Sequence, residues 1–416
     1  MAVTLSAVGT ADQTPAPWLD PARYWGSLAT ATEGLESPLG VLELGALRFN
    51  THDLVRRAAG KPIRVASKSI RIRGLTESLL ATEGYAGVLA FTLPEALWLA
   101  ETVDDVVVGY PTADAAALRR LASDPVAAAR VTLMVDSLEH LDFIDACIAP
   151  QQREVLRPCL ELDVSWSSRV PVGHVGVWRS PLRTPEDAAA FARTIERRPG
   201  FRLVGMMAYE AQIAGLGDRD SPTGTWSKSK SWIKRRSVPE LTERRGLAVA
   251  SVRNVAELEF VNGGGTGSLE TTSQDDSITE VAAGSGILGG HLFDLYRSFH
   301  PAPAASFALS VVRKPTPTMA VILGGGWVAS GPPGDDRMPQ LAWPANLHFV
   351  RREMAGEVQT PVHGSGAETL RPGDRVWLRH AKSGELSERI NEFVVVDGDR
   401  VVDRLTTYRG EGKAFL

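Results

Sequence analysis

Short apolar runs rich in β-branched residues alternate with longer stretches of helical period along residues 40–268. This alternation is typical of βα units with parallel strands. Eight runs predict strands, each followed by a helix or a loop: residues 40–47, 63–70, 87–92, 105–110, 131–136, 156–164, 202–209 and 260–268. Their number and spacing predict a (β/α)₈ TIM-like barrel, with a doubly wound parallel sheet as the alternative.

The pattern changes near residue 300, where strand-like runs continue without any helical period between them. These runs are punctuated by Gly, Pro and Asp and cover residues 306–312, 319–323, 374–378, 392–396 and 401–408. They predict a smaller all-β domain, either a small barrel or a sandwich. We therefore expect three parts: an N-terminal arm (1–36), a barrel domain (37–299) and a C-terminal β domain (300–416).

Composition narrows the class of partner. The 416 residues carry a formal charge of −4, so electrostatics gives no reason to expect nucleic acid or an anionic membrane surface. No apolar run reaches the length that spans a bilayer, and no secretory leader is recognisable. The two cysteines, Cys147 and Cys159, show no metal-ligand spacing, and we interpret them as small buried apolar residues rather than a disulfide or a nucleophile. A cytoplasmic protein is expected.

Lys68 is the first candidate for chemistry. It ends the second predicted strand, and active sites of (β/α)₈ barrels lie at the carboxyl ends of the strands. A lysine amine close to an apolar interior is a competent Schiff-base nucleophile, because desolvation disfavours its charged form. The alternative is a lysine that ends a strand and extends to solvent.

A glycine-rich turn at residues 261–268 follows the last predicted strand. Consecutive glycines let backbone N–H groups turn toward an anion, and hydroxyl groups can add donors. The residues that we expect to bind phosphate here are Gly264, Gly265, Thr266 and Gly267, with Gly284 and Ser285 in a second small-residue turn. Phosphate sites of barrels often lie after the last strands, although a single turn of this kind can also be a plain loop.

Ionisable residues also follow other strands. Glu161 and Asp163 end the sixth predicted strand, and Tyr209 and Glu210 end the seventh. In the β domain, His380 and Lys382 lie in a dense group of charged residues after a strand. Each group has an alternative structural interpretation, as carboxylates that solvate a strand end or as a structural histidine.

Taken together, these segments resemble the fold-type III pyridoxal-phosphate enzymes, the class of alanine racemase, over residues 36–416. Within that class they are most similar to the D-threonine aldolase and D-serine dehydratase branch, and residues 407–415 resemble sequences named amino acid deaminase/aldolase. The resemblance implies that Lys68 holds pyridoxal 5′-phosphate as a Schiff base and that the two glycine turns bind its phosphate.

Further positions follow from the same resemblance. Arg179 is similar to a family arginine beside the cofactor's phenolic oxygen, with Arg169 as the competing candidate. Tyr209 matches a tyrosine that lines the pyridine ring, although Glu210 and Ala211 replace the Gly-His pair that follows it in the branch. Enzymes of this fold type commonly complete their sites across a dimer, so a homodimer is expected.

The sharpest departure from the branch concerns a metal. The branch carries a His-x-Cys or His-x-Asp pair that binds a divalent cation, whereas here His380 is followed by Lys382. An ammonium has no lone pair to offer a metal and repels a cation. Either the metal is absent, or Glu385 or Glu388 supplies the second ligand beside His380.

The resemblance implies a lyase that acts on a β-hydroxy amino acid, with the D enantiomer expected, by aldol cleavage or by dehydration and deamination. His380 is the candidate acid or base, and Lys382 could stabilise an oxyanion or bind a substrate carboxylate. The alternatives are an amino acid racemase and a protein that binds pyridoxal phosphate without turnover.

Overall fold

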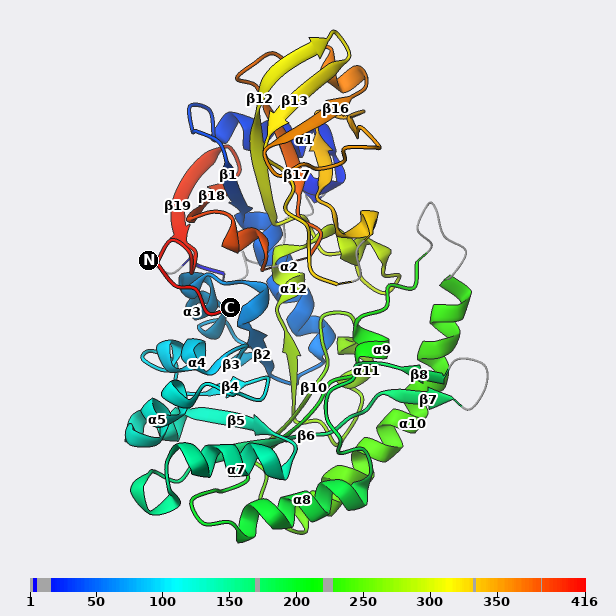
Figure 1. Ribbon diagram of the computed structural model, residues 1–416. Coiled ribbons are helices and arrows are strands. Elements are labelled where there is room, and N and C mark those ends of the chain that lie inside the picture. Colours follow the sequence, from blue (N-terminus) through cyan, green and yellow to red (C-terminus); the bar gives the residue numbers. More distant parts are fainter. Residues whose placement is uncertain (1–2, 6–15, 169–172, 220–226, 332–333, 383) are drawn as a thin grey trace. The chain divides into compact units, whose positions relative to one another are not determined.

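The computed structural model describes residues 3–5, 16–168, 173–219, 227–331, 334–382 and 384–416 (Figure 1). The chain forms two compact units. The barrel unit comprises Leu54–Lys68, Leu80–Gly284 and Phe415–Leu416, and the mostly-β unit comprises Met1–Asp53, Ser69–Leu79 and Ser285–Ala414. Because the chain passes repeatedly between the units, they do not coincide with the predicted consecutive domains at 1–36, 37–299 and 300–416.

The barrel unit contains a closed barrel of eight parallel strands. Around the barrel their order is β10 (Phe260–Gly263), β11 (Glu280–Ala283), β2 (Ile63–Ala66), β3 (Tyr85–Ala90), β4 (Val106–Val108), β5 (Val131–Val135), β6 (Arg157–Glu161) and β9 (Gly205–Ala208). The closed parallel barrel confirms the predicted (β/α)₈ class and excludes the doubly wound sheet.

One predicted barrel strand is wrong. The strand expected over residues 40–47 is β1 (Leu39–Glu43), which pairs with β12 and β18 of the mostly-β unit. β11 takes the remaining place in the barrel, between β10 and β2. All five residues of β1 are buried, and a fully buried strand has the same pattern in either kind of sheet. Lys68 therefore follows the first barrel strand and the glycine-rich turn follows the seventh.

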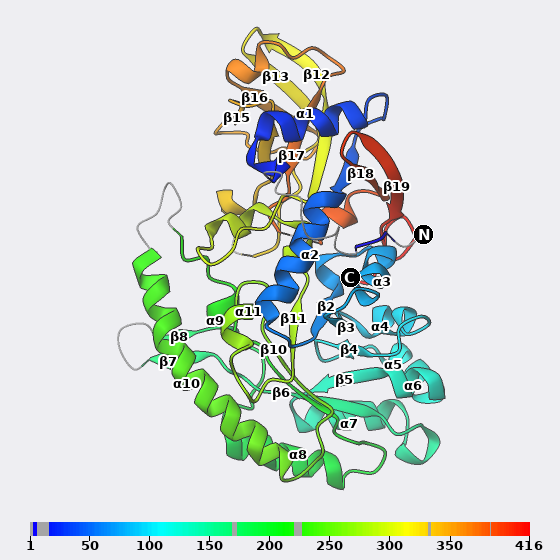
Figure 2. The ribbon, with the colours of Figure 1, turned by 180° about the vertical axis from the view of Figure 1, so that it is seen from behind.

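Helices cover the outside of the barrel in the barrel unit (Figure 1). They are α4 (Leu93–Leu99), α5 (Ala115–Ser123), α6 (Pro125–Arg130), α7 (Leu138–Cys147), α8 (Pro185–Arg197), α9 (Ala211–Ala214), α10 (Ser227–Arg253) and α11 (Leu269–Thr272). The long helix α10 packs along α8, as Figure 2 shows from behind. Two further helices, α2 (Leu44–Ala58) and α3 (Arg73–Leu80), span boundaries between the units.

An apolar cluster fills the interior of the barrel. It consists of Val107, Met134, Cys159, Val204, Met207 and Phe260. Both cysteines are free thiols: Cys159 is buried in this cluster, whereas Cys147 is half-buried. The predicted burial is therefore confirmed for Cys159, whereas the half-buried Cys147 differs from the prediction.

The mostly-β unit contains one nine-stranded sheet. Its strands are β1, β12 (Ala305–Thr316), β13 (Met319–Leu323), β14 (Gln340–Trp343), β15 (His348–Phe349), β16 (Gln359–His363), β17 (Arg375–Arg379), β18 (Glu392–Asp397) and β19 (Arg400–Thr406). The long strand β12 joins its two parts, because its first half pairs with β1 and β17 and its second half with β13. In the described residues this sheet is not closed, so the small barrel, one of the two predicted forms of this domain, is not observed.

Helices also belong to this unit, which is therefore mostly β rather than all β. Helix α1 (Pro21–Ala31) packs Tyr24, Trp25 and Leu28 against Val41 and Trp377 of the sheet, so this part of the predicted arm is integral to the unit. Helix α12 (Ser285–Leu288) follows β11.

Short 3₁₀ turns and one hairpin complete the described elements. The turns are η1 (Pro17–Leu19), η2 (Ser67–Ser69), η3 (Pro150–Gln152), η4 (His291–Leu295), η5 (Asp335–Arg337), η6 (Ser365–Ala367) and η7 (Leu386–Glu388), and the hairpin strands are β7 (Trp166–Ser168) and β8 (Gly173–Val175). Among the described helices, none combines the length and the apolar character that crossing a membrane requires.

Candidate active site

Lys68 lies at the carboxyl end of β2, as predicted. The strand ends at Ala66, and the turn η2 holds the half-buried Lys68 side chain beside Tyr110. Lys68 Nζ donates a hydrogen bond of 2.6 Å to Tyr110 Oη. Tyr110 follows β4, the second strand along the barrel from β2, so its hydroxyl reaches the same edge.

The environment of Tyr110 favours its ionised form. Burial raises the pKa of a phenol, but the charge and hydrogen bond of Lys68 and the charge of Arg179 outweigh burial here. The pKa of Tyr110 is consequently lowered from its ordinary value of 10.0. Tyr110 ends the fourth predicted strand but was not among the predicted site residues.

Arg179 lies between two tyrosines. Its guanidinium carbon is 5.4 Å from the ring centre of Tyr110 and 5.3 Å from that of Tyr209, within the range of cation–π attraction. Tyr209 follows β9, and its burial raises its pKa to about 12 despite the opposing charge of Arg179. The structure thus brings the predicted residues Lys68, Arg179 and Tyr209 together around Tyr110. The competing candidate Arg169 lies outside the described residues.

Glu161 completes this group at the end of β6. Its side chain is buried, and its carboxylate lies 3.9 Å from Arg179. Burial raises the pKa of Glu161 to about 7, with Arg179 opposing the shift and Asp136 and Asp163 adding to it. A carboxyl group that ionises near neutral pH can hold or release a proton at the rim of the barrel.

Glu161 should make the stability of the fold fall with rising pH. Its folded-state pKa of about 7 exceeds the ordinary value of 4.5, so between these values the folded chain binds a proton that the unfolded chain lacks. Stability is therefore lost as pH rises through this window, by on the order of 2–3 kcal/mol. Urea unfolding at pH 5 and pH 8 should show this loss reduced in Glu161→Gln; an equal loss in both proteins would contradict the assignment.

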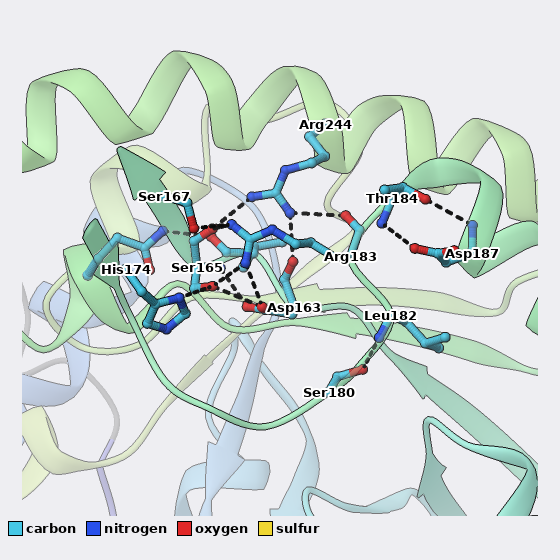
Figure 3. A network of polar contacts seen from close by, with 12 residues as sticks. Asp163, Ser165, Ser167, His174, Ser180, Leu182, Arg183, Thr184, Asp187 and Arg244 are labelled. Carbon is cyan, nitrogen blue, oxygen red and sulfur yellow. Dashed lines mark hydrogen bonds and ion pairs between the residues drawn. The ribbon is translucent and has the colours of Figure 1, made fainter. Parts of the chain in front are cut away.

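The insert between β6 and α8 carries Arg179, and two other arginines fix its position (Figure 3). The Arg183 guanidinium donates to the Asp163 carboxylate at 3.0 Å and to the hydroxyls of Ser165 and Ser167 at 3.0 and 2.9 Å. From α10, Arg244 donates to the main-chain oxygens of Asp163, Arg183 and Ser165 at 2.6, 3.1 and 3.0 Å. Both arginines therefore hold the two ends of the insert together.

Two further contacts lie close to Arg179 in sequence. Ser180 Oγ donates to the main-chain oxygen of Glu161 at 2.7 Å, which ties the segment to the end of β6. Thr184 and Asp187 form a capping box that begins α8, by reciprocal bonds of 3.1 and 3.2 Å. Arg179 is thus held between fixed points and does not belong to a free loop.

The glycine-rich turn after β10 surrounds a buried carboxylate. Glu210 is 1% exposed and accepts hydrogen bonds from the Gly264 N–H and from Ser268 Oγ, both at 3.1 Å. It also accepts from Thr272 Oγ1 and pairs with Arg245 at 3.3 Å. The Gly264 amide, one of the predicted phosphate donors, is therefore already used by Glu210, and Gly264 shapes the turn instead.

Gly265 connects this turn to the tyrosine cluster. A Cβ atom at this position would lie 3.3 Å from Tyr209 Cε2 and 3.1 Å from Ala214 Cβ, so any side chain would press on the Tyr209 ring. The Gly265 amide donates to Ser268 Oγ at 3.1 Å. The next residues, Thr266 and Gly267, are buried, and the Thr266 carbonyl accepts a bond of 2.5 Å from Arg57.

The second small-residue turn lies at a boundary between the units. Gly284 is the last residue of the long barrel segment, and Ser285 begins α12 in the mostly-β unit. Within that unit, Ser285 Oγ lies 3.1 Å from Ser69 Oγ.

His380 and Lys382 belong to the mostly-β unit and follow β17. His380 is buried, and desolvation together with the charges of Arg379 and His291 lowers its pKa to about 3. Lys382 Nζ lies 3.4 Å from Ser330 Oγ. The imidazole is thus neutral over the physiological range.

The carboxylates that could join His380 as metal ligands already have other partners in the described residues. Glu388 pairs with Arg71 at 2.8 Å, and Glu385 accepts the Ser330 N–H at 3.0 Å. Within the ranges that the structure describes, no group of three or more His, Cys, Asp and Glu side chains is arranged to hold a metal. The side chain two positions after His380 is the basic Lys382, whose ammonium group repels a cation and offers it no lone pair.

The comparisons with known proteins now identify the family. The family model described as alanine racemase, N-terminal domain, matches residues 42–260, more than half of the chain. The chain belongs to this family, which confirms the resemblance to fold-type III pyridoxal-phosphate enzymes.

Individual relatives are consistent with the same class. The chain is 28% identical over 261 residues to 3-hydroxy-D-aspartate aldolase of Paracoccus denitrificans, covering 60% of each protein. The chain thus spans about three fifths of the length of the curated relatives it matches.

Two solved structures show the same fold. D-threonine aldolase from Filomicrobium marinum is 18% identical with a TM-score of 0.73, over 91% of this chain and 96% of that one. D-threo-3-hydroxyaspartate dehydratase from Delftia sp. HT23 is 19% identical with a TM-score of 0.63, over 90% and 98%.

The described residues of the barrel unit fit pyridoxal phosphate. A primary amine lies at the carboxyl end of a barrel strand and bonds to a tyrosine, and an arginine lies over the rings of that tyrosine and a second one. A glycine without room for a side chain brings a turn of small residues to one of those tyrosines. Amine, aromatic ring and small-residue turn are the groups that an aldehyde-bearing, flat, phosphorylated cofactor requires.

Proposed function

We propose that the protein is a pyridoxal-phosphate-dependent lyase that cleaves a D-β-hydroxy amino acid. The observation that carries the proposal is the Lys68 amine at the barrel rim, hydrogen-bonded to Tyr110 and close to Arg179. The names of the relatives, two aldolases and a dehydratase, support this substrate class. Bound pyridoxal phosphate supplies an electron sink for negative charge that develops on the substrate.

Each residue of the barrel unit has a proposed part. The Lys68 amine attaches the cofactor, and Arg179 and Tyr209 bind its ring. The phosphate is assigned to the small-residue turns, where Gly264 and Gly265 provide the close approach and Thr266, Gly267, Gly284 and Ser285 provide the donors. Glu161, with its pKa of about 7, can take up or release a proton beside Arg179 near neutral pH.

His380 and Lys382 are proposed to act on the substrate's hydroxyl and carboxylate groups. A neutral imidazole with a pKa of about 3 is a weak base, which favours a hydrogen-bonding role for His380. The positive charge of Lys382 suits an oxyanion or a carboxylate. A homodimer in the cytoplasm is our proposal for assembly and location, and it rests on the family resemblance and the sequence.

The products of D-threo-3-hydroxyaspartate test the reaction type. Aldol cleavage breaks the Cα–Cβ bond and gives glycine and glyoxylate, whereas dehydration and deamination give ammonia and oxaloacetate. We expect glycine from this substrate and from D-threonine, and no product from the L enantiomers. Ammonia without glycine would assign the protein to the dehydratase type instead. Formation of the L enantiomer without glycine or ammonia would show that the protein is a racemase and not a lyase.

Removal of metal should leave this turnover unchanged. The described residues around His380 provide no three-ligand group, so dialysis of the holoenzyme against EDTA should leave the rate as it was. Turnover that is lost on dialysis and restored by added Mn²⁺ or Zn²⁺ would contradict this expectation.

A further inference from the structure

Tyr110 is the residue that links Lys68 to the rest of the cluster. Its hydroxyl oxygen accepts a hydrogen bond of 2.6 Å from Lys68 Nζ, and a charged donor strengthens such a bond. Its ring also faces Arg179, whose guanidinium carbon is 5.4 Å from the ring centre. A phenol flanked by two basic side chains is stabilised as a phenolate.

The neighbouring ionisable groups are placed differently. Tyr209, with its pKa raised to about 12, stays protonated and lies against Arg179. Glu161 pairs with Arg179 at 3.9 Å. The Tyr110 oxygen, which accepts the hydrogen bond from Lys68 Nζ, is positioned to exchange a proton with that amine.

We propose that Tyr110 is the acid–base residue for Lys68. The Tyr110 phenolate takes a proton from the Lys68 ammonium: an N–H bond breaks, an O–H bond forms, and the nitrogen keeps its electron pair for attack on an aldehyde carbon. The same proton returns to Nζ when the amine is released. The proposal rests on the proposed function, in which Lys68 carries the cofactor.

The rate of cofactor uptake by the full-length protein tests this role. Purified protein stripped of cofactor is mixed with pyridoxal phosphate, and absorbance near about 420 nm, typical of the lysine-bound cofactor, is followed from pH 6 to pH 10. Tyr110→Phe should slow uptake at pH 7 by about 100-fold or more, since general acid–base catalysis typically contributes about 10²- to 10⁴-fold. The midpoint of its pH profile should rise, and its rate should approach that of the wild type at high pH.

Tyr85→Phe is the matched control. Tyr85 begins β3 and pairs with Ile63 at the start of β2, so it lies at the opposite end of the same strands from Lys68. Its pH profile of uptake should match the wild type. A profile of Tyr110→Phe that also matches the wild type in rate and midpoint would overturn the proposal.

A second variant covers poor folding of Tyr110→Phe. Placing 3-fluorotyrosine at position 110 lowers the pKa of the phenol and keeps its hydroxyl, so the midpoint of uptake should fall; an unchanged midpoint would overturn the proposal. Lys68→Ala separates the two claims. If Lys68→Ala still acquires the band, the proposed function fails. If Lys68→Ala lacks the band but the Tyr110 variants take up the cofactor as the wild type does, only the role of Tyr110 is rejected.

Discussion

Lys68→Ala should lower turnover of a D-β-hydroxy amino acid by at least about a thousandfold, because the variant has no amine to attach the cofactor. The fold should persist, since Lys68 is half-buried in a one-turn helix after β2 and not in the apolar core. Turnover is measured with saturating pyridoxal phosphate, and folding is checked by circular dichroism.

Lys61→Ala is the matched control for this loss. Lys61 precedes β2 as Lys68 follows it, and its Nζ donates to the Asp275 main-chain oxygen at 2.5 Å. Because Lys61 lies at the amino end of the strand, its replacement should leave turnover at the wild-type rate. Turnover that survives in Lys68→Ala while the cofactor is bound would show that another group attaches it.

Glu210→Leu should destabilise the fold by on the order of 3–5 kcal/mol. The substitution leaves the Gly264 amide and the hydroxyls of Ser268 and Thr272 without their buried acceptor. It also removes one of the two buried carboxylates of Arg245, which then retains Asp275 at 2.7 Å. Equilibrium urea unfolding measures the loss. Glu210→Gln keeps an acceptor oxygen, so its free energy of unfolding should lie between those of the wild type and Glu210→Leu.

Glu259→Gln provides the comparison for an exposed carboxylate. Glu259 is 43% exposed and pairs with Arg157 at 2.5 Å. A solvent-exposed pair contributes about 1 kcal/mol or less, so this variant should unfold almost as the wild type does. If Glu210→Leu and Glu259→Gln lost equal free energy of unfolding, this would contradict the claim that a buried network around Glu210 holds the glycine-rich turn.

The barrel class could be predicted because its signal is local. Each βα unit repeats an apolar run and a helical period, and seven of the eight predicted strands are barrel strands. Which of β1 and β11 is the eighth strand of the barrel could not be predicted, because both strands are buried throughout. Burial on both faces removes the alternation that distinguishes one kind of sheet from another.

The candidate site was partly visible in the sequence. Lys68 and Tyr209 were predicted as residues at strand ends and Arg179 from the family resemblance, and the structure places all three around Tyr110. The contact between Lys68 and Tyr110 depends on the spacing of β2 and β4 around the barrel, which no local pattern encodes. Likewise, the sequence shows that Glu210 stands where the family branch has a different residue. Only the folded turn shows that its carboxylate accepts a hydrogen bond from the Gly264 N–H.

Covalent capture of the cofactor tests the central claim most directly. The purified protein is saturated with pyridoxal phosphate, its spectrum is recorded, and borohydride reduction is followed by peptide mass mapping. We predict a band near about 420 nm, as expected for this cofactor on a lysine, and a single reduced adduct on Lys68. A spectrum of protein absorbance alone, or an adduct on any other lysine, would contradict the assignment of Lys68.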